Sequence, residues 1–270
     1  MTHILTDLST PAVVHSIQQN MYELCWSLRT NWTQSTFEEH ARLRRYRSPV
    51  PMDFIFNAAY STQPPEGDES ELIEETIAFF KTGKRKSFAW WLFPGLETSN
   101  WGPQLTDRGF KYLSEPPGMA AVLSSLPAQT ARPDGLKITR VEDEAAMLTF
   151  CKTFVEGYEM PMAWEPFVEG MMLATLGGKM ISFLAEVDGH PVATSSLFLQ
   201  AGVAGIYNVA TLEHWRGKGI GAAVTLHPLL EARQLGYQVG ILQSSEMGYP
   251  IYQRLGFKEN CRMNHYHWEG

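Results

Sequence analysis

Glycines and basic residues between positions 215 and 222 carry the clearest chemical signal in this chain. The run Trp215-Arg216-Gly217-Lys218-Gly219-Ile220-Gly221-Ala222 lies between an apolar stretch at 206–211, which predicts a strand, and one at 222–235, which predicts a helix. A glycine-rich turn at the start of a helix leaves backbone N–H groups unpaired at the positive end of the helix dipole, with no Cβ atoms to keep a phosphate away. Arg216 and Lys218 add positive charge. The segment therefore predicts a pyrophosphate site.

Two common phosphate loops fit this segment poorly. A Walker A loop requires Ser or Thr after its Gly-Lys pair, whereas Gly217-Lys218 is followed by Gly219. A dinucleotide fingerprint is formally present as Gly217-x-Gly219-x-x-Ala222, but it should follow the strand directly and be answered about 20 residues later by an acidic residue. Residues 212–215 separate strand and loop, and the next predicted strand, at 237–242, ends in Gln243-Ser244-Ser245. We therefore disfavour a nicotinamide site.

A longer pattern supports a third interpretation. Arg216-x-x-Gly219-x-Gly221 is followed, beyond the strand at 237–242, by Ile251-Tyr252-Gln253-Arg254-Leu255-Gly256-Phe257. Together these motifs resemble the GNAT superfamily of acyl-CoA-dependent N-acyltransferases: the first is similar to that family's pyrophosphate loop, the second to its "LYxxxGF" signature. The resemblance covers residues 136–269, about half of the chain.

The resemblance implies acetyl-CoA as co-substrate and assigns residues to it. The predicted loop contacts are Arg216, Gly217, Lys218, Gly219, Ile220, Gly221 and Ala222. The end of the preceding strand, Val209, Ala210 and Thr211, would run beside the pantetheine arm, where a strand N–H polarises the acetyl carbonyl. Ser245 stands where relatives commonly have an asparagine that bonds the coenzyme.

Tyr252 is the predicted general acid. A phenol with a reference pKa of about 10 can protonate a departing thiolate whose own pKa is about 8.5. The alternative is that Tyr252 is simply a half-buried aromatic on a short helix. The proton acceptor is open, because neither strand near the expected thioester contains an acidic residue. The neutral candidates are Asn208, Gln243, Ser244 and Ser245, and we favour a water-relayed proton.

The acceptor side is predicted at 156–167, a segment that mixes carboxylates with aromatics. Glu159 and Trp164 are the candidate substrate residues, since such a lining can receive a cationic amine. A loop merely anchored by its aromatics is an equally open alternative. No metal is expected: Cys25, Cys151 and Cys261 are far apart, and the sequence has no Cys-x-x-Cys pair.

Sequence similarity between the two halves of the chain, here called the internal echo, predicts a duplicated unit. Residues 55–60 (Ile-Phe-Asn-Ala-Ala-Tyr) are similar to 206–211, and Gly109-Phe110-Lys111 matches Gly256-Phe257-Lys258. Chance similarity of short apolar words is the alternative. After Tyr60 the first copy has an acidic, proline-bearing stretch where the second has its glycine loop, so we expect no coenzyme there. This is similar to tandem GNAT proteins with a degenerate N-terminal copy.

The predicted organisation is a degenerate GNAT-like domain at 1–126, a linker at 127–135 and a catalytic GNAT domain at 136–270. The fold class is α/β (α+β), with two GNAT-like units, each a mixed, mostly antiparallel sheet flanked by helices. In the second unit we expect strands at 136–141, 180–187 and 192–199, helices at 143–158 and 165–176, a short helix at 248–254 and a last strand at 262–268. In the first, residues 88–93 predict a buried strand.

Composition narrows the setting. The formal net charge of −7 gives no reason to expect nucleic-acid binding. No apolar run reaches the length of about 20 residues that a membrane helix needs, and no secretory leader is evident, so we expect a cytoplasmic protein without membrane contact. A homodimer is left open. Two functions remain: an N-acetyltransferase acting by direct attack of a small-molecule or protein amine on acetyl-CoA, or a non-catalytic acyl-CoA-binding regulatory protein.

Overall fold

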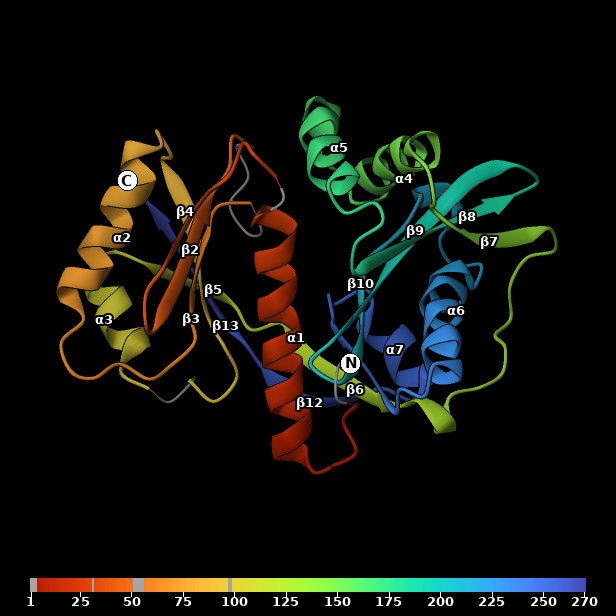
Figure 1. The fold of residues 1–270 in the computed structure, drawn as a ribbon, viewed down its shortest axis with the longest axis horizontal. Coiled ribbons are helices and arrows are strands. Elements are labelled where there is room, and N and C mark those ends of the chain that lie inside the picture. Colours follow the sequence, from red (N-terminus) through yellow and green to blue (C-terminus); the bar gives the residue numbers. More distant parts are fainter. Residues whose placement is uncertain (1–3, 31, 51–55, 97–98) are drawn as a thin grey trace. The chain divides into compact units, whose positions relative to one another are not determined.

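The computed structural model describes residues 4–30, 32–50, 56–96 and 99–270, and its contacts divide the chain into two compact units (Figure 1). Unit 1 contains the described residues up to 30 together with Gly118–Asn260, and unit 2 contains those from Trp32 to Pro117 together with Cys261–Gly270. Each unit holds a mixed, mostly antiparallel sheet flanked by helices, which confirms the predicted fold class.

Unit 1 is built on a sheet that, within the described residues, has seven strands in the order β12-β6-β11-β10-β9-β8-β7. The pairs from β7 to β10 are antiparallel, as is β6 with β11, whereas β10 and β11 are parallel. The strands are β6 (Pro117–Val122), β7 (Leu136–Arg140), β8 (Met180–Val187), β9 (His190–Gln200), β10 (Val203–Thr211), β11 (Val239–Gln243) and β12 (Lys258–Arg262). The strands predicted at 136–141, 180–187, 192–199, 206–211 and 237–242 all appear here. The last predicted strand, at 262–268, appears as β13 (Asn264–Glu269), but it lies in the sheet of unit 2, so its expected place in the catalytic unit was wrong.

Helices of unit 1 cover this sheet. They are α1 (Thr10–Thr30), α4 (Glu144–Gly157), α5 (Glu165–Leu173), α6 (Ile220–Gln234) and α7 (Tyr249–Leu255), with short 3₁₀ turns η1 (Leu123–Ser125), η2 (Met162–Trp164) and η3 (Glu213–Trp215). The α4 helix begins where the side chain of Asp143 accepts a hydrogen bond from the N–H of Ala146 at 2.8 Å, a standard N-cap. The α6 helix packs against the sheet through buried side chains such as Val224 and Leu226.

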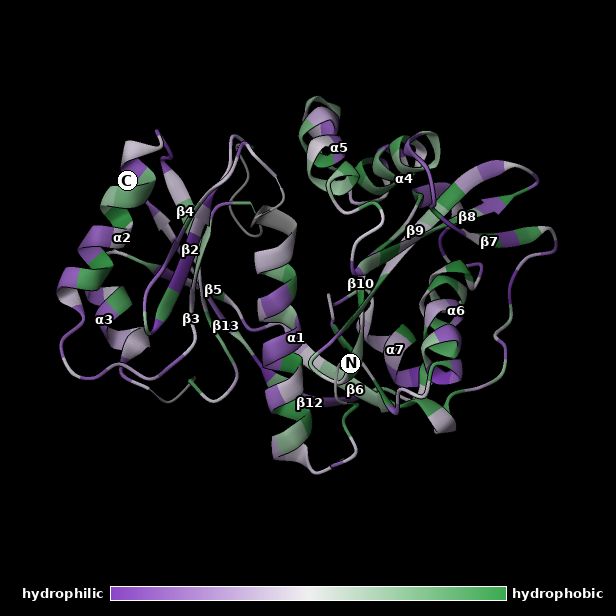
Figure 2. Cartoon of the chain, viewed as in Figure 1, coloured by the Kyte–Doolittle hydropathy of each residue, from purple (hydrophilic) through white to green (hydrophobic). Residues whose placement is uncertain are grey.

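Unit 2 has a sheet with the order β1-β2-β3-β4-β13-β5, six strands among the described residues. They are β1 (Thr36–Glu39), β2 (Leu43–Arg47), β3 (Ala58–Ser61), β4 (Ser87–Leu92), β5 (Lys111–Ser114) and β13 (Asn264–Glu269), flanked by α2 (Ser70–Thr82) and α3 (Trp101–Asp107). The prediction of a buried strand at 88–93 is confirmed, since Phe88 and Trp90 are fully buried. Figure 2 shows apolar and polar segments alternating along α2, whose buried residues include Ile73 and Phe80.

Each unit contains a strand from the other half of the sequence. Strand β6, from the first half of the chain, pairs with β11 of unit 1 from Gly118↔Gln243 to Val122↔Val239. Strand β13, from the end of the chain, pairs with β4 and β5 of unit 2. Helix α1 also belongs to unit 1. The two compact units therefore do not coincide with the predicted domains at 1–126 and 136–270. The residue at which the catalytic domain begins stays a prediction.

None of the helices in the described ranges combines the length and apolarity required to cross a bilayer. Residue 55, the first of the internal echo, lies outside the described residues.

Candidate functional site

The carboxyl ends of β10 and β11 separate. These parallel strands pair only at Ala204↔Gly240 and Gly205↔Ile241, although β10 continues to Thr211. A register shift between Tyr207 and Ala210 marks a bulge against β9, and Asn208 within it has a φ of +52°. Bulges bend a strand and increase its twist, which turns the end of β10 away from β11. An opening between two parallel strands at their carboxyl ends is a usual place for a ligand.

A cavity of about 740 Å³ lies at this opening, within the size range of small-molecule sites. The predicted site residues that line it are Glu159, Val209, Ala210, Thr211, Arg216, Gly217, Gly219, Gly221, Ala222, Ser245 and Tyr252. Three predicted residues are not among its lining: Lys218, Ile220 and Trp164. Ile220 instead packs in the core beneath α6, and the ammonium of Lys218 lies 4.5 Å from the centre of the Trp215 ring. The structure thus brings most of the motif residues together around one space.

The glycine loop presents backbone amides to this cavity. Gly219 is the N-cap of α6 with a φ of +83°, and no side chain caps the helix there. The first amides of a helix have no intrahelical acceptor, so they can donate to an anion. A Cβ on Gly219 would lie 2.2 Å from the carbonyl oxygen of Ala131. Glycine is therefore required at 219 by backbone conformation and by a neighbouring segment.

That neighbouring segment is the predicted linker. Pro127, Thr130 and Ala131 line the cavity, which sequence reasoning did not anticipate. Proline-punctuated composition indicated only a connection between domains, and no local pattern shows that such a segment lies beside a loop some 90 residues away.

Arg216 and Glu159, predicted for different ligands, contact each other. The guanidinium of Arg216 donates to Glu159 Oε1 at 2.7 Å, to the Gly157 carbonyl at 2.9 Å and to the Thr211 carbonyl at 3.1 Å. Arg216 thereby ties the glycine loop to the end of β10 and to the segment after α4. Glu159, at a φ of +55°, is the only carboxylate lining the cavity among the described residues, and it is paired.

Tyr252 lies on α7 with 8% of its surface exposed. Desolvation raises the pKa of its phenol, and the nearby Tyr158 adds to the rise, while a side-chain hydrogen bond with Thr225 opposes it. The phenol is therefore protonated at neutral pH and able to donate. Tyr158 also lines the cavity, and sequence reasoning had not distinguished it from the rest of segment 156–167.

The neutral candidates for handling the amine proton have different surroundings. Asn208 Nδ2 donates to Ser196 Oγ at 3.1 Å, and buried Ser244 donates to the Ser245 carbonyl at 2.8 Å. Ser245 Oγ accepts from the Gly248 N–H at 3.2 Å. Gln243 lines the cavity with a buried Nε2 that has no hydrogen-bond partner in the described part of the chain. None of these four side chains is a base, which is consistent with the predicted water-relayed proton.

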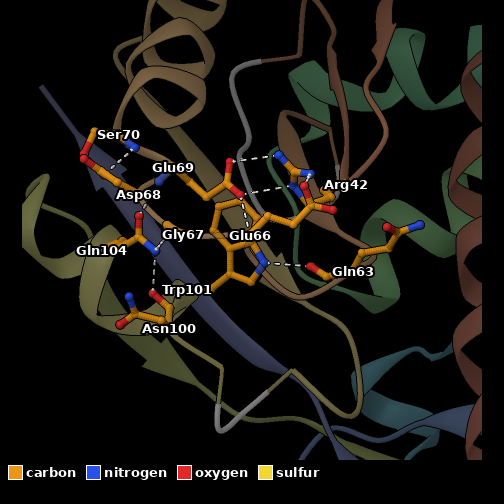
Figure 3. Close-up of polar contacts among 10 residues, drawn as sticks. All are labelled: Arg42, Gln63, Glu66, Gly67, Asp68, Glu69, Ser70, Asn100, Trp101 and Gln104. Carbon is orange, nitrogen blue, oxygen red and sulfur yellow. Dashed lines mark hydrogen bonds and ion pairs between the residues drawn. The ribbon is translucent and has the colours of Figure 1, made fainter.

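Unit 2 has a counterpart that is built differently. Its parallel strands β3 and β4 stay paired to Ser61↔Leu92, and the Trp90 indole N–H donates to Ser61 Oγ at 2.8 Å. In the loop before α2, the Glu69 carboxylate accepts from the Glu66 N–H at 2.9 Å and pairs with Arg42 at 3.1 Å (Figure 3). The Glu69 carboxylate thus occupies a backbone amide of this loop and the nearby Arg42. That unit 2 binds no coenzyme stays a prediction.

Metal-binding side chains do not gather in the structure as described: no group of three or more His, Cys, Asp or Glu residues is placed to hold an ion. Cys25, Cys151 and Cys261 form no disulfide in the described part of the chain.

Comparison with known proteins agrees with this geometry. Residues 179–259 match the family model of the acetyltransferase (GNAT) domain. A GCN5-related N-acetyltransferase from Kribbella flavida has a similar structure, with a TM-score of 0.70 and 18% identity over 98% of this chain and 97% of that one. A second, from Sphaerobacter thermophilus, has a TM-score of 0.66 and 16% identity over 100% and 95% of the two chains.

A tandem GNAT protein from the clavulanic acid biosynthesis pathway is also similar, with a TM-score of 0.62 and 12% identity over 98% of this chain and 95% of that one. At such identities the likeness concerns the fold. No curated protein matches the chain in sequence.

Proposed function

We propose that this chain, whose residues 179–259 match the acetyltransferase (GNAT) domain and whose fold is similar to that of a tandem GNAT protein, transfers an acetyl group from acetyl-CoA to the primary amine of a small molecule or protein. The observation that carries this proposal is the cavity at the parted ends of β10 and β11, which joins the uncapped start of α6 to Tyr252. The diphosphate of the coenzyme would thus lie at the start of α6, and its thioester would lie near Tyr252.

The residues divide the chemistry as follows. Amides of Gly219, Ile220 and Gly221 bind the diphosphate, and the backbone at 209–211 pairs with the pantetheine amides and donates to the acetyl oxygen. The amine attacks the thioester carbon in a ternary complex, so that a C–N bond forms while negative charge gathers on that oxygen. When the C–S bond breaks, Tyr252 protonates the thiolate, and a water accepts the proton of the amine.

One observation favours the alternative function, a non-catalytic acyl-CoA-binding regulatory protein. The cavity's one carboxylate among the described residues, Glu159, is paired with Arg216, so that no free base lines the site. A protein that binds acyl-CoA without turning it over would have the same loop and cleft.

Thiol release separates the two functions. Purified protein is first titrated with acetyl-CoA in a calorimeter and then incubated with acetyl-CoA and a panel of alkylamines, amino alcohols, diamines and lysine-containing peptides. We expect saturable binding and amine-dependent release of free CoA. Binding without release with any amine would favour the regulatory protein, and absence of binding would refute both.

A further inference from the structure

The segment before β7 crosses unit 1 between two buried leucines. Leu126 and Leu136 belong to the two core clusters that include residues of α6. Residues 127–132, here called the strap, lie between these leucines and form no helix or strand. Pro127 begins the strap and Pro133 follows it, which restricts the backbone at both ends. The strap is therefore anchored on either side, while its middle part lies at the surface.

Contacts at both ends place the strap across one end of the cavity. A Cβ on Gly219, the N-cap of α6, would lie 2.2 Å from the Ala131 carbonyl oxygen. A Cβ on Gly256, the C-cap of α7, would lie 4.0 Å from Leu126 Cδ2. The strap thus runs from the end of α7 to the start of α6, where the diphosphate is proposed to bind. The strap residues that line the cavity are Pro127, Thr130 and Ala131.

The polar groups of the strap have no hydrogen-bond partner within the described chain. The backbone N–H groups from Ala128 to Arg132 and the hydroxyl of half-buried Thr130 are therefore available as donors. Backbone N–H groups in folded proteins almost always pair with protein, water or a ligand. An anion bound beside the strap would provide such a partner.

The cations of the glycine loop are largely engaged within the protein. Arg216 donates to Glu159 and to two backbone carbonyls, and the ammonium of Lys218 lies over the Trp215 ring. Arg254 also lines the cavity, and it has no ion pair among the described residues. It lies on α7, the helix whose end adjoins the strap. A diphosphate at the start of α6 would therefore gain from further donors on its other side, and the strap is placed to supply them.

We propose that the strap is a coenzyme-binding element, whose backbone amides and Thr130 hydroxyl donate to the diphosphate of acetyl-CoA. The glycine loop holds the diphosphate from one side and the strap from the other. This inference rests on the coenzyme binding that the proposed function requires, and it names the class of acyl donor: a nucleotide-bearing thioester rather than a short pantetheine thioester. Coenzyme binding should accordingly order the strap.

Hydrogen exchange of the intact protein tests this. Amide exchange is followed by mass spectrometry, from milliseconds to minutes, without ligand and with an excess of CoA, dephospho-CoA or pantetheine. We expect CoA and dephospho-CoA to slow exchange at least fivefold, both at 128–132 and at the glycine-loop amides 219–222, and pantetheine to leave 128–132 unchanged. The turn Ala201-Gly202 precedes β10, whose other end lines the cavity, and it is the internal control that should exchange equally in all four samples.

Thr130→Val removes the hydroxyl and keeps the shape of the side chain. CoA should bind about fivefold more weakly to this variant, the size expected of one hydrogen bond, while the affinity for pantetheine stays the same. The matched control is Thr149→Val, which removes a hydroxyl on α4 that bonds the Ala145 carbonyl and lies outside the cavity lining. It should bind CoA as wild type does. Unchanged CoA affinity in Thr130→Val would overturn the role of the hydroxyl.

The outcomes separate this inference from the proposed function. If CoA protects 219–222 and not 128–132, or if pantetheine protects the strap as well as CoA does, the inference falls while coenzyme binding stands. Protection of the strap by CoA and not by dephospho-CoA would place the contact at the 3′-phosphate and overturn the diphosphate assignment. If calorimetry shows no binding of CoA, the proposed function fails and this inference with it.

Discussion

At the scale of single residues, Tyr252 is distinguished by its environment rather than by its type. The side chain is almost buried, yet it lines the cavity, and desolvation keeps the phenol protonated. A phenol held in its neutral form is a donor over the whole pH range in which the enzyme would work. A tyrosine exposed to water would lose its proton near pH 10.

Replacing Tyr252 with phenylalanine should lower kcat about tenfold, below the usual range for general acids because a thiolate is a good leaving group. The affinity for acetyl-CoA should change little, since the diphosphate contacts lie elsewhere. Because burial raises the pKa of Tyr252, its acid form persists above pH 10, and wild-type kcat should show no decline from this residue up to about that pH. Steady-state kinetics from pH 6 to 10 measure both effects.

Tyr249→Phe is the control on the same helix, because the Tyr249 hydroxyl bonds Glu259 at the surface. This variant should keep wild-type kcat. An unchanged kcat in Tyr252→Phe would remove the general-acid role.

At the scale of elements, the turn into α6 combines two glycines that have similar backbone conformations and different neighbours. Gly217 has a φ of +74° and open space around a Cβ position, whereas Gly219 has a φ of +83° and the Ala131 carbonyl in the way. Substitution of Gly217 therefore introduces backbone strain alone, whereas substitution of Gly219 introduces the same strain and a clash with the segment at 127–135.

Alanine at either position should cost about 1–2 kcal/mol of stability, because left-handed backbone is unfavourable for a residue with a Cβ. Gly219→Ala should in addition displace the Ala131 segment and weaken acetyl-CoA binding at least tenfold, while Gly217→Ala weakens it less. Calorimetric titration and urea unfolding of both variants provide the measurements. Equal losses of affinity would show that the segment at 127–135 does not matter for the loop.

Sequence patterns predicted the elements where the pattern is local. The strand at 180–187 appears with those bounds as β8, because six of its eight residues are apolar and Asp188-Gly189 provides the turn. The glycine loop and Tyr252 motif likewise meet at one cavity. The bond between Tyr207 and Asn20 joins residues 187 positions apart, and no local spacing encodes it. For the same reason the roles of α1, β6 and the segment at 127–135 could not be predicted.

At the scale of the whole molecule, the exchanged segments decide what can fold alone. A fragment of residues 136–270 lacks β6, which bonds along the whole of β11, and lacks α1 with its Asn20 contacts. It also retains β13 without β4 and β5 to pair with. An open strand edge and an uncovered apolar face favour aggregation.

We therefore expect the 136–270 fragment to be insoluble or to lack a cooperative thermal transition, whereas the intact chain unfolds cooperatively. Supplying residues 1–135 as a second, co-expressed chain should recover soluble protein that binds acetyl-CoA. Solubility, circular dichroism and calorimetry would follow the outcome. A 136–270 fragment that folds and binds the coenzyme by itself would contradict this expectation.

The exchange of β6 and β13 bears on how a duplicated gene can evolve. Because β6 pairs with β11 and β13 pairs with β4, deletion of either half of the chain would remove a strand from the sheet of the other. The first half is therefore needed for the fold of unit 1, whether or not it binds a coenzyme. Among related proteins, the sequence of the loop before α2 should accordingly vary more than the sequences of β6 and β13.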